Sequence, residues 1–288
     1  MPELPEVEVV KKTLESQIKN LIIKNIEIID KNLRYKVKKQ SIKKILGLKV
    51  IKIKRRSKYL LFLFNKNLVM IVHLGMTGKF FFVKNDLTKR RTSFYYNTND
   101  YKEKHNRIIF ILSKNMKLIY NDIRKFGFIK VLFSSELKKE YHLKTLGPEP
   151  LGKNYNFKYF RNYLIGKKKK IKDLLMDQKF ISGLGNIYVN EILFLSKIKP
   201  DKNVNILNDK EIKNIISNTK KILKKAIIFG GSSIKNFSNS SGKKGNFQEM
   251  FSVYGRLGYK CSNSDCKGII KKMLLSNRSS FFCPICQK

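Results

Sequence analysis

The sequence opens with MPELPE, residues 1–6, where two of the six prolines of the chain fall within five positions. Proline restricts the backbone, and an amphipathic pattern follows at once, so we expect a stiff, anchored start to the chain. From Val7 onward, apolar residues recur at positions 10, 14, 18 and 21, with charged residues between them. This spacing predicts a helix whose apolar face packs the opening residues onto a core.

Pro2 offers a reactive group as well as a rigid backbone. Cells commonly remove a methionine that precedes a small residue, and its removal here would expose the secondary amine of Pro2. An α-amino group has a pKa near ~7.8 against ~10.4 for lysine, so much more of it is neutral and nucleophilic at pH 7. Its attack on an acetal or aldehyde carbon would give an iminium, with Glu3 and Glu6 as candidate proton carriers. The alternative is that Pro2 only starts a helix whose first turn favours glutamate.

The charge of the chain is strongly unbalanced. Its 62 Lys and Arg against 21 Asp and Glu give a net charge of +41, which indicates a polyanionic partner, nucleic acid first. Part of this excess reflects composition, because the chain is rich in Lys, Ile and Asn and has no Trp, as an A/T-rich genome would produce. No apolar run approaches the ~20 residues of a membrane span, and no signal-peptide pattern precedes the acidic opening. We therefore expect a cytoplasmic protein.

Short apolar runs predict strands through the first half of the chain, at residues 50–53, 59–64, 68–73, 79–83, 107–112, 117–120 and 128–133. Residues 65–67 and 113–115 have the length of hairpin connections, whereas the polar stretch 88–104 has no period and indicates a loop. Many short strands with tight turns favour an antiparallel sandwich or barrel.

The spacing of apolar residues changes from a strand pattern to a helix pattern at LGPEP, residues 146–150. Two prolines there end the strand region. Helical spacing follows at residues 156–165, 170–178 and 186–197, and then in a longer helix that starts at Asn208 and is closed by Gly230-Gly231. Residues 232–245 are rich in Ser, Asn, Gly and Lys, so we expect a segment that is mobile when no ligand is bound. At 288 residues the chain suits two domains better than one.

The four cysteines follow the pattern Cys261-x4-Cys266-x16-Cys283-x2-Cys286. Two pairs of thiols separated by a hairpin-sized interval predict one structural Zn²⁺ with tetrahedral sulfur ligands. Four sulfur ligands leave no open position for a catalytic water. The first pair is wider than the common two-residue gap.

Several other segments have two interpretations each. The turn Gly183-Leu184-Gly185-Asn186, beside the lysine run at 167–172, is either a simple interhelical turn or a phosphate cradle. Lys58 and Arg278 are either solvated charges or contacts to DNA phosphates. Met76 in HLGMTG (73–78) and Phe126 in DIRKFG (122–127) are either core residues or wedges that enter a base stack.

Together these stretches resemble the formamidopyrimidine-DNA glycosylase / endonuclease VIII family over nearly the whole chain. The matching stretches occur in the family's order at residues 2–8, 55–61, 73–78, 122–127, 146–151, 183–188 and 230–237, and at the terminal cysteines. The resemblance implies an α+β multidomain fold: an N-terminal helix plus antiparallel β-sandwich, a helix-two-turn-helix bundle and a zinc-finger β-hairpin. It also implies that double-stranded DNA binds between the two domains and that the protein acts as a monomer.

The resemblance further implies roles for single residues. Pro2 resembles the nucleophile that attacks C1′ of the damaged nucleotide, Glu3 resembles the acid/base that opens the sugar, and Glu6 a supporting acid. Lys58 is similar to the family's catalytic-pocket lysine. The expected DNA contacts are His73, Met76, Arg124, Phe126, Lys172, Asn186 and Arg278, with the first of these in the HLGMTG block. Within this set, Met76, Arg124 and Phe126 would fill the gap left by the everted base.

The domains expected from the resemblance are a catalytic domain at 1–134, a linker at 135–150, a helix-two-turn-helix domain at 151–248 and a zinc finger at 249–288. A lesion lid at 232–246 would contain Lys235. This lid lacks the proline usual before its last glycine, and Ile123 replaces a frequent proline, so the chain departs from the family pattern at both places.

The opening and the Met/Arg/Phe set resemble the branch that removes oxidised purines such as 8-oxoguanine and formamidopyrimidines, by Schiff-base formation and β,δ-elimination. Two alternatives are open: an endonuclease VIII-like enzyme for oxidised pyrimidines, and a non-catalytic zinc-ribbon DNA-binding protein. The second has no need for Pro2 followed by Glu3.

Overall fold

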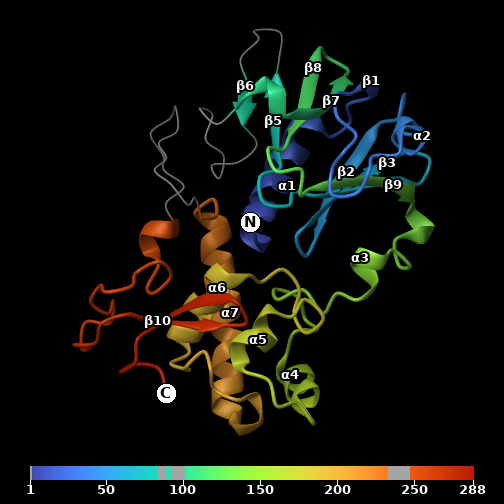
Figure 1. Cartoon of the computed structure of the whole chain (residues 1–288). Helices are drawn as coiled ribbons and strands as arrows, with labels where there is room; N and C mark the ends of the chain where they lie inside the picture. Colours follow the sequence, from blue (N-terminus) through green and yellow to red (C-terminus); the bar gives the residue numbers. More distant parts are fainter. Residues whose placement is uncertain (1, 84–88, 92–100, 233–246) are drawn as a thin grey trace. The chain divides into compact units, whose positions relative to one another are not determined.

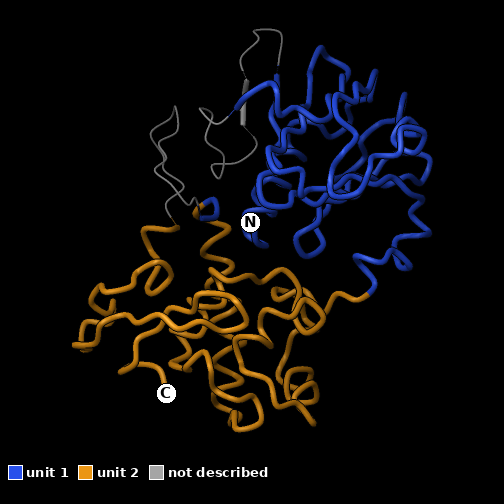
Figure 2. Tube along the Cα trace, in the orientation of Figure 1, with its two compact units in different colours: residues 1–144, 230–245 blue, residues 145–229, 246–288 orange. Residues whose placement is uncertain are grey.

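The structure, a computed structural model, describes residues 2–83, 89–91, 101–232 and 247–288 (Figure 1). The chain divides into two compact units (Figure 2). The first unit contains residues 1–144 and 230–245, and the second contains residues 145–229 and 246–288. The chain therefore leaves the second unit after Phe229 and returns to it at Asn246.

Helix α1 (Leu4–Ile18) begins directly after Glu3, with Pro5 in its first turn. Proline is tolerated there because the first N–H groups of a helix have no intrahelical acceptor. The predicted apolar stripe is confirmed by four side chains that are at most 1% exposed: Val7, Val10, Leu14 and Ile18. Burial of this face holds the start of the chain against the core of the first unit.

Two antiparallel sheets form most of the first unit as described. One has the strand order β2 (Val50–Arg56), β3 (Tyr59–Phe64), β4 (Leu68–His73), β9 (Phe128–Phe133). The other has the order β1 (Ile23–Ile28), β7 (Asn106–Leu112), β8 (Met116–Asn121), β5 (Lys79–Val83), β6 (Lys89–Arg91). Neighbouring strands in both sheets run antiparallel.

One apolar cluster joins both sheets and α1. It includes Val10 of α1, Phe62 of β3 and Phe110 of β7, each at most 1% exposed. The rings of Phe62 and Phe80, on strands of different sheets, have centroids 5.8 Å apart. The helix plus antiparallel sandwich predicted for this half of the chain is therefore confirmed.

The predicted hairpin connections are also confirmed. Lys66 and Asn67, between β3 and β4, have φ of 58° and 56°, and Lys114 and Asn115, between β7 and β8, have φ of 60° and 51°. Two consecutive residues with positive φ are typical of the two-residue turns whose twist matches that of the strands they join.

The predicted loop at 88–104 is wrong in two places. Residues 89–91 form β6, which pairs with β5, and Glu103–His105 form the 3₁₀ helix η2. Strand β6 is held by backbone pairing, so its sequence KRR shows no apolar period. The sequence analysis also misses β1 and the short helix α2 (Lys39–Lys43). The register of β1 against β7 shifts between Ile23 and Asn25, which breaks the alternation that identifies a strand.

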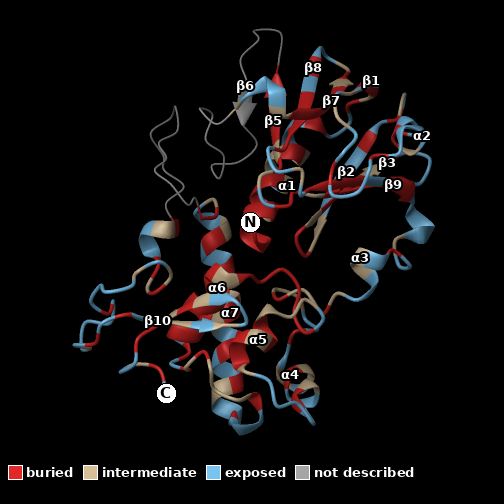
Figure 3. Cartoon of the chain, in the orientation of Figure 1, coloured by how far each residue is buried: buried red, intermediate tan, exposed pale blue. Residues whose placement is uncertain are grey.

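The second unit contains α4 (Phe157–Leu164), α5 (Ile171–Met176), α6 (Asn186–Leu195) and α7 (Asp209–Ile228). Asparagine side chains cap two of these helices: Asn156 accepts from the N–H of Tyr159, and Asn208 accepts from the N–H of Glu211, both at 2.9 Å. The predicted helix starts are confirmed there. Helix α6 is buried over nearly its whole length (Figure 3), so side chains on all its faces contact other elements of the second unit.

A hairpin of β10 (Lys271–Leu275) and β11 (Arg278–Phe282) lies between the two cysteine pairs. The remaining short elements are α3 (Tyr141–Lys144), η3 (Ser134–Glu136), η4 (Val204–Ile206) and η5 (Phe247–Met250). Within the described ranges, no helix is both long and apolar enough to cross a membrane.

Candidate functional site

The opening turn of the chain is held by the carboxylate of Glu6, which is 1% exposed. One of its oxygens accepts from the N–H of Glu3 at 2.9 Å. The other accepts from both the N–H and the hydroxyl of Ser232, at 2.7 and 2.9 Å. Gly231, with φ of +82°, lies so close that an added Cβ would be 3.0 Å from the same carboxylate. Glu6 thus fixes Glu3 to a segment of the first unit that is far away in sequence.

Pro2 and Glu3 precede α1 directly, and both are buried, Glu3 to 3% exposure. While Met1 is attached, the nitrogen of Pro2 belongs to a tertiary amide and has no nucleophilic lone pair. Chemistry at this nitrogen therefore requires removal of Met1. The structure places the predicted acid beside the predicted nucleophile on a turn that Glu6 makes rigid.

Lys58 lies on the turn between β2 and β3, where Ser57 has a φ of 55° and Lys58 itself is 7% exposed. Arg55 ties this turn to α1. Its Nε donates to Glu8 of α1 at 2.7 Å, and its Nη1 donates to the carbonyl of Ser57 at 2.8 Å. The sequence analysis missed Glu8 and Arg55, since nothing in a local pattern pairs residues this far apart. Their ion pair couples the position of Lys58 to the helix that follows Pro2.

His73, the last residue of β4, lies among the aromatic rings of Tyr59 and Phe128, with centroids 5.0 and 5.8 Å from its own. Burial lowers its pKa from 6.5 to about 4, and the positive charges of Lys58 and Arg34 act in the same direction. Its Nδ1 accepts from the N–H of Gly75 at 3.1 Å, which leaves the ring proton on Nε2. At neutral pH His73 is therefore a neutral imidazole whose Nε2 carries the proton.

The buried imidazole gives a first prediction about stability. Because the pKa in the folded state, about 4, lies below the unfolded value of 6.5, the unfolded chain takes up this proton first as the pH falls. The contribution of His73 to the free energy of unfolding is complete above pH 6.5. It falls by on the order of 3 kcal/mol as the pH falls from 6.5 through 4. In urea unfolding at pH 7 and pH 4.5, His73→Asn should lose less stability between the two pH values than the wild type does. An equal loss in both proteins would contradict the assignment.

The predicted wedge residues sit on two loops that lie side by side. Met76 is 39% exposed and Phe126 is 43% exposed, which is unusual for large apolar side chains and excludes the interpretation of both as core residues. The guanidinium of Arg124 lies over the Phe126 ring, 4.5 Å from its centroid. The structure therefore brings two of the three side chains that the resemblance grouped, Arg124 and Phe126, into contact, and packs their loop against Gly75, which precedes Met76.

In the second unit, the hairpin β10–β11 lies against the predicted phosphate contacts. Lys172 of α5 is 1% exposed, and its Nζ donates to the carbonyl of Ser279 at 2.9 Å and to the hydroxyl of Ser280 at 2.6 Å. The side-chain amide of Asn186 donates to the same carbonyl of Ser279 at 3.0 Å. Arg278 is the preceding residue of the hairpin. Lys172 and Asn186 thus meet at one carbonyl of the hairpin, one residue after Arg278.

The pKa of Lys172 is lowered to about 8, chiefly by burial; the charge of Asp173 opposes this shift, and the charge of Arg278 contributes to it. The turn at 183–186, which the sequence offers as a phosphate cradle, has fewer free backbone groups than such a cradle would use. The N–H of Gly183 donates to the side chain of Gln178 at 2.8 Å, and Gln178 also donates to the carbonyl of Leu184 at 2.9 Å. The turn therefore uses part of its polar backbone internally.

Two polar residues of α6 that the sequence analysis missed hold this arrangement. Asn190 accepts from the N–H of Phe281 at 2.7 Å and donates to the carbonyl of Asn186. The carboxylate of Glu191 accepts three backbone N–H groups, from residues 252, 253 and 254, at 2.8–3.0 Å. Burial raises the pKa of Glu191, while these hydrogen bonds act against that rise. Two polar residues inside an otherwise apolar helical run are the signal that would have identified them.

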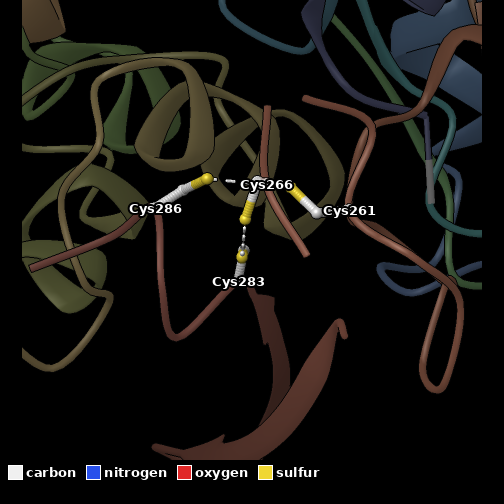
Figure 4. Close-up of side chains that lie close together, drawn as sticks. All are labelled: Cys261, Cys266, Cys283 and Cys286. Atoms are coloured by element: carbon white, nitrogen blue, oxygen red, sulfur yellow. Dashed lines mark hydrogen bonds between the residues drawn. The ribbon is translucent and has the colours of Figure 1, made fainter. Parts of the chain in front are cut away.

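The four cysteines converge as the sequence predicts (Figure 4). Their sulfur atoms all lie within 4.8 Å of one another, with Cys261 to Cys286 at 3.7 Å and Cys266 to Cys283 at 3.6 Å. A tetrahedral zinc site with bonds of about 2.3 Å has sulfur–sulfur edges near 3.8 Å, so these residues fit that ion. Gly268 donates its N–H to the sulfur of Cys266 at 3.3 Å, and a Cβ there would lie 2.8 Å from the sulfur of Cys283.

The wide first cysteine pair is accommodated by Asn263. Its carbonyl accepts from the N–H of Cys266 at 3.0 Å, and its side-chain amide lies 3.7 Å from the sulfur of Cys286. The extra residues between Cys261 and Cys266 thus form a turn that places the Cys266 sulfur beside the other three. Of the lid predicted at 232–246, only Ser232 is described; Lys235 and the other lid residues, 233–246, lie outside the described residues.

Comparison with known proteins covers the entire chain. Residues 1–129 match the formamidopyrimidine-DNA glycosylase N-terminal domain, and residues 146–238 match the formamidopyrimidine-DNA glycosylase H2TH domain. A formamidopyrimidine-DNA glycosylase of Rickettsia bellii (strain OSU 85-389) is 43% identical over 288 residues, 100% of both chains.

Two solved structures of Lactococcus lactis Fpg are similar in fold. One is a complex with DNA containing an abasic site, with a TM-score of 0.86, 36% identity and 99% of each chain covered. The other is the wild-type protein with DNA containing an oxidised pyrimidine, with a TM-score of 0.85, 35% identity and 100% of each chain covered. Because two family domains and a full-length relative match in order, this chain belongs to the formamidopyrimidine-DNA glycosylase family.

Proposed function

We propose that this protein is a DNA glycosylase and abasic-site lyase that removes oxidised purines, 8-oxoguanine and formamidopyrimidines, from double-stranded DNA. The observation that carries the proposal is the opening turn, where Pro2 and Glu3 are fixed by the Glu6 carboxylate in front of α1. A nucleophile on a frayed terminus would have to be ordered at each encounter. Here that ordering is already supplied by the fold.

In the proposed reaction, the nitrogen of Pro2, once Met1 is removed, attacks C1′ of the damaged nucleotide. The C1′–N bond to the base breaks, the base leaves with the electron pair and takes up a proton, and the Pro2 nitrogen gives up its own proton. The sugar ring then opens: the C1′–O4′ bond breaks, O4′ takes up a proton, and an iminium forms between Pro2 and C1′. The iminium acidifies the C2′ proton, so β-elimination breaks the C3′–O bond and δ-elimination then breaks the C5′–O bond. Glu3 is proposed to carry protons during sugar opening, and Lys58 to offset the charge of a nearby phosphate.

DNA binding is proposed to use both units. Met76, Arg124 and Phe126 would occupy the space left by the everted base and offset the cost of unstacking it, which is a few kcal/mol. Arg124 would face the orphaned cytosine. In the second unit, Lys172, Asn186 and Arg278 would bind backbone phosphates and set the register without reading sequence. The net charge of +41 favours this association at low salt.

The proposed domains are a catalytic domain at 1–134, a linker at 135–150, a helix-two-turn-helix domain at 151–248 and a zinc finger at 249–288. We propose Zn²⁺ as the ion of the finger, held by Cys261, Cys266, Cys283 and Cys286. Bound there, it would cross-link a segment whose own apolar cluster is small.

The experiment that tests the function is borohydride trapping of the untagged protein on two duplexes, one with 8-oxoguanine opposite cytosine and one with thymine glycol. The proposal expects a covalent adduct on both through the common lyase step, with faster excision of 8-oxoguanine under single-turnover conditions. Faster excision of thymine glycol would instead support the pyrimidine enzyme, the alternative that the Lactococcus lactis complex with an oxidised pyrimidine favours. Tight DNA binding with no adduct on either duplex would instead support the second alternative, a non-catalytic DNA-binding protein.

A further inference from the structure

A fully buried carboxylate, that of Asp122, lies beneath the two loops that carry the wedge residues. One of its oxygens accepts from the hydroxyl of Thr77 at 2.5 Å. The other accepts from the N–H of Gly127 at 2.9 Å and from the hydroxyl of Tyr120 at 3.3 Å. Asp122 is 0% exposed. A single side chain therefore bonds the 74–78 loop, the 122–127 loop and the end of strand β8.

Thr77 links the Asp122 carboxylate to the backbone of Arg124. Its hydroxyl has one hydrogen, which it donates to Asp122, and its oxygen accepts from the N–H of Arg124 at 2.9 Å. The path from the Arg124 backbone through Thr77 to Asp122 thus consists of two hydrogen bonds with defined directions. Because the second of these bonds, from Thr77 to Asp122, ends on a carboxylate, it is a charge-assisted bond.

Backbone packing brings the same two loops into direct contact. A Cβ on Gly75 would lie 2.4 Å from the backbone carbonyl carbon of Phe126, and a Cβ on Gly127 would lie 1.8 Å from the hydroxyl of Tyr120. Gly75 also has a φ of +61°, which favours glycine. Neither loop can shift without the other, since their backbones touch at the positions that flank Met76 and Phe126.

We propose that Thr77 and Asp122 are positioning residues that hold Met76, Arg124 and Phe126 as one preformed wedge. The inference rests on the proposed function, in which those three side chains replace an everted base. Loops that are already ordered in the free protein lose less conformational entropy when the wedge enters the base stack. The hydroxyl of Thr77 therefore matters for base eversion and does not matter for the chemistry at C1′.

This division of labour predicts a selective defect. Excision of 8-oxoguanine from an intact pair needs eversion of a stacked base, whereas a preformed abasic site has no base to unstack. Thr77→Val keeps the shape of the side chain but removes both hydrogen bonds. We expect it to lower the single-turnover rate of 8-oxoguanine excision by about 10- to 100-fold, from the loss of buried hydrogen bonds, and to leave cleavage at an abasic site within about twofold.

Two controls frame the measurement. Thr77→Ser retains the hydroxyl and should restore excision to within about threefold of the wild type. Thr13→Val removes a threonine hydroxyl that donates only within α1, to the carbonyl of Val9 at 3.2 Å, and should change neither activity. As a spectroscopic readout, 2-aminopurine placed next to the lesion should brighten more slowly on binding Thr77→Val than on binding the wild type.

Asp122→Asn provides a second route if Thr77→Val is poorly folded. The new side chain has one acceptor oxygen where the carboxylate has two, so either the Thr77 hydroxyl or the N–H of Gly127 would face an amide nitrogen, and the same selective loss is expected. The inference is overturned if Thr77→Val everts and excises 8-oxoguanine like the wild type, or if it loses both activities in equal measure. Inactivity of the wild type on both substrates would instead overturn the proposed function.

Discussion

A chain whose N-terminus is blocked by an extra residue or a tag is expected to give no borohydride-trapped adduct, at least about 100-fold below the untagged protein. The extension turns the nitrogen of Pro2 into an amide nitrogen, whose lone pair is delocalised into the carbonyl. The next candidate amines are lysines, whose neutral fraction at pH 7 is several hundred times smaller than that of an α-amino group. No other group in the proposed mechanism supplies the Schiff base.

The sharpest form of this experiment uses one preparation in two states. The chain is made with a cleavable N-terminal extension, assayed, and assayed again after a protease has exposed Pro2 as the first residue. Trapping should appear only after cleavage, while affinity for DNA with a non-cleavable abasic analogue, measured by fluorescence anisotropy, should change much less. Equal trapping before and after cleavage would exclude Pro2 as the nucleophile and direct attention to Lys58.

Removal of the metal is expected to have the second large effect. Chelation, or Cys283→Ser, should release the ion and lower DNA affinity by about 100-fold or more, because zinc binding and folding of such a segment are one equilibrium. The hairpin supplies the carbonyl of Ser279 and the hydroxyl of Ser280, which accept from Lys172 and Asn186. When the hairpin loses its order, the proposed phosphate contacts lose their supports together.

The measurement combines metal content, circular dichroism and anisotropy on the same samples. Wild-type protein should contain one zinc ion per chain, and Cys283→Ser should contain none. Ser264→Ala, next to the cysteine cluster but outside the set of sulfur ligands, is a matched control that should keep both metal and affinity. Gly268→Ala should weaken metal retention without removing a ligand, since its Cβ would lie 2.8 Å from the sulfur of Cys283. Undiminished DNA affinity in metal-free protein would contradict this account.

Much of the fold follows from local patterns. The stripe from Val7 to Ile18 predicted α1, and Asn208 followed by Glu211 predicted the start of α7, because helix faces and caps are properties of neighbouring residues. Strands with clear apolar runs were also predicted. Strand β6 and strand β1 were missed, because one is an edge strand of charged residues and the other is interrupted where its register shifts.

The candidate site likewise contains residues that local sequence patterns predict and residues that they do not. Sequence patterns alone predicted the cluster of four cysteines and offered Pro2 with Glu3 as candidates, a role that the family resemblance then implied. They did not identify Glu8 with Arg55, Asn190, Glu191, or Thr77 with Asp122, although each of these residues supports a predicted one. Such partners are separated by up to 91 positions, as in the bond between Asn190 and Phe281, and no local period relates them.

The sequence by itself determined the strong positive charge and the helices and strands with regular patterns, and it predicted the candidate reactive groups and the cysteine cluster. Only the tertiary structure decided that Glu6 anchors the opening turn through Ser232, 226 positions away, and that one buried carboxylate binds both wedge loops. The physical reason is that local periodicity is set by neighbours in the chain. Hydrogen bonds between distant side chains, in contrast, exist only once packing has fixed the register of the elements that carry them.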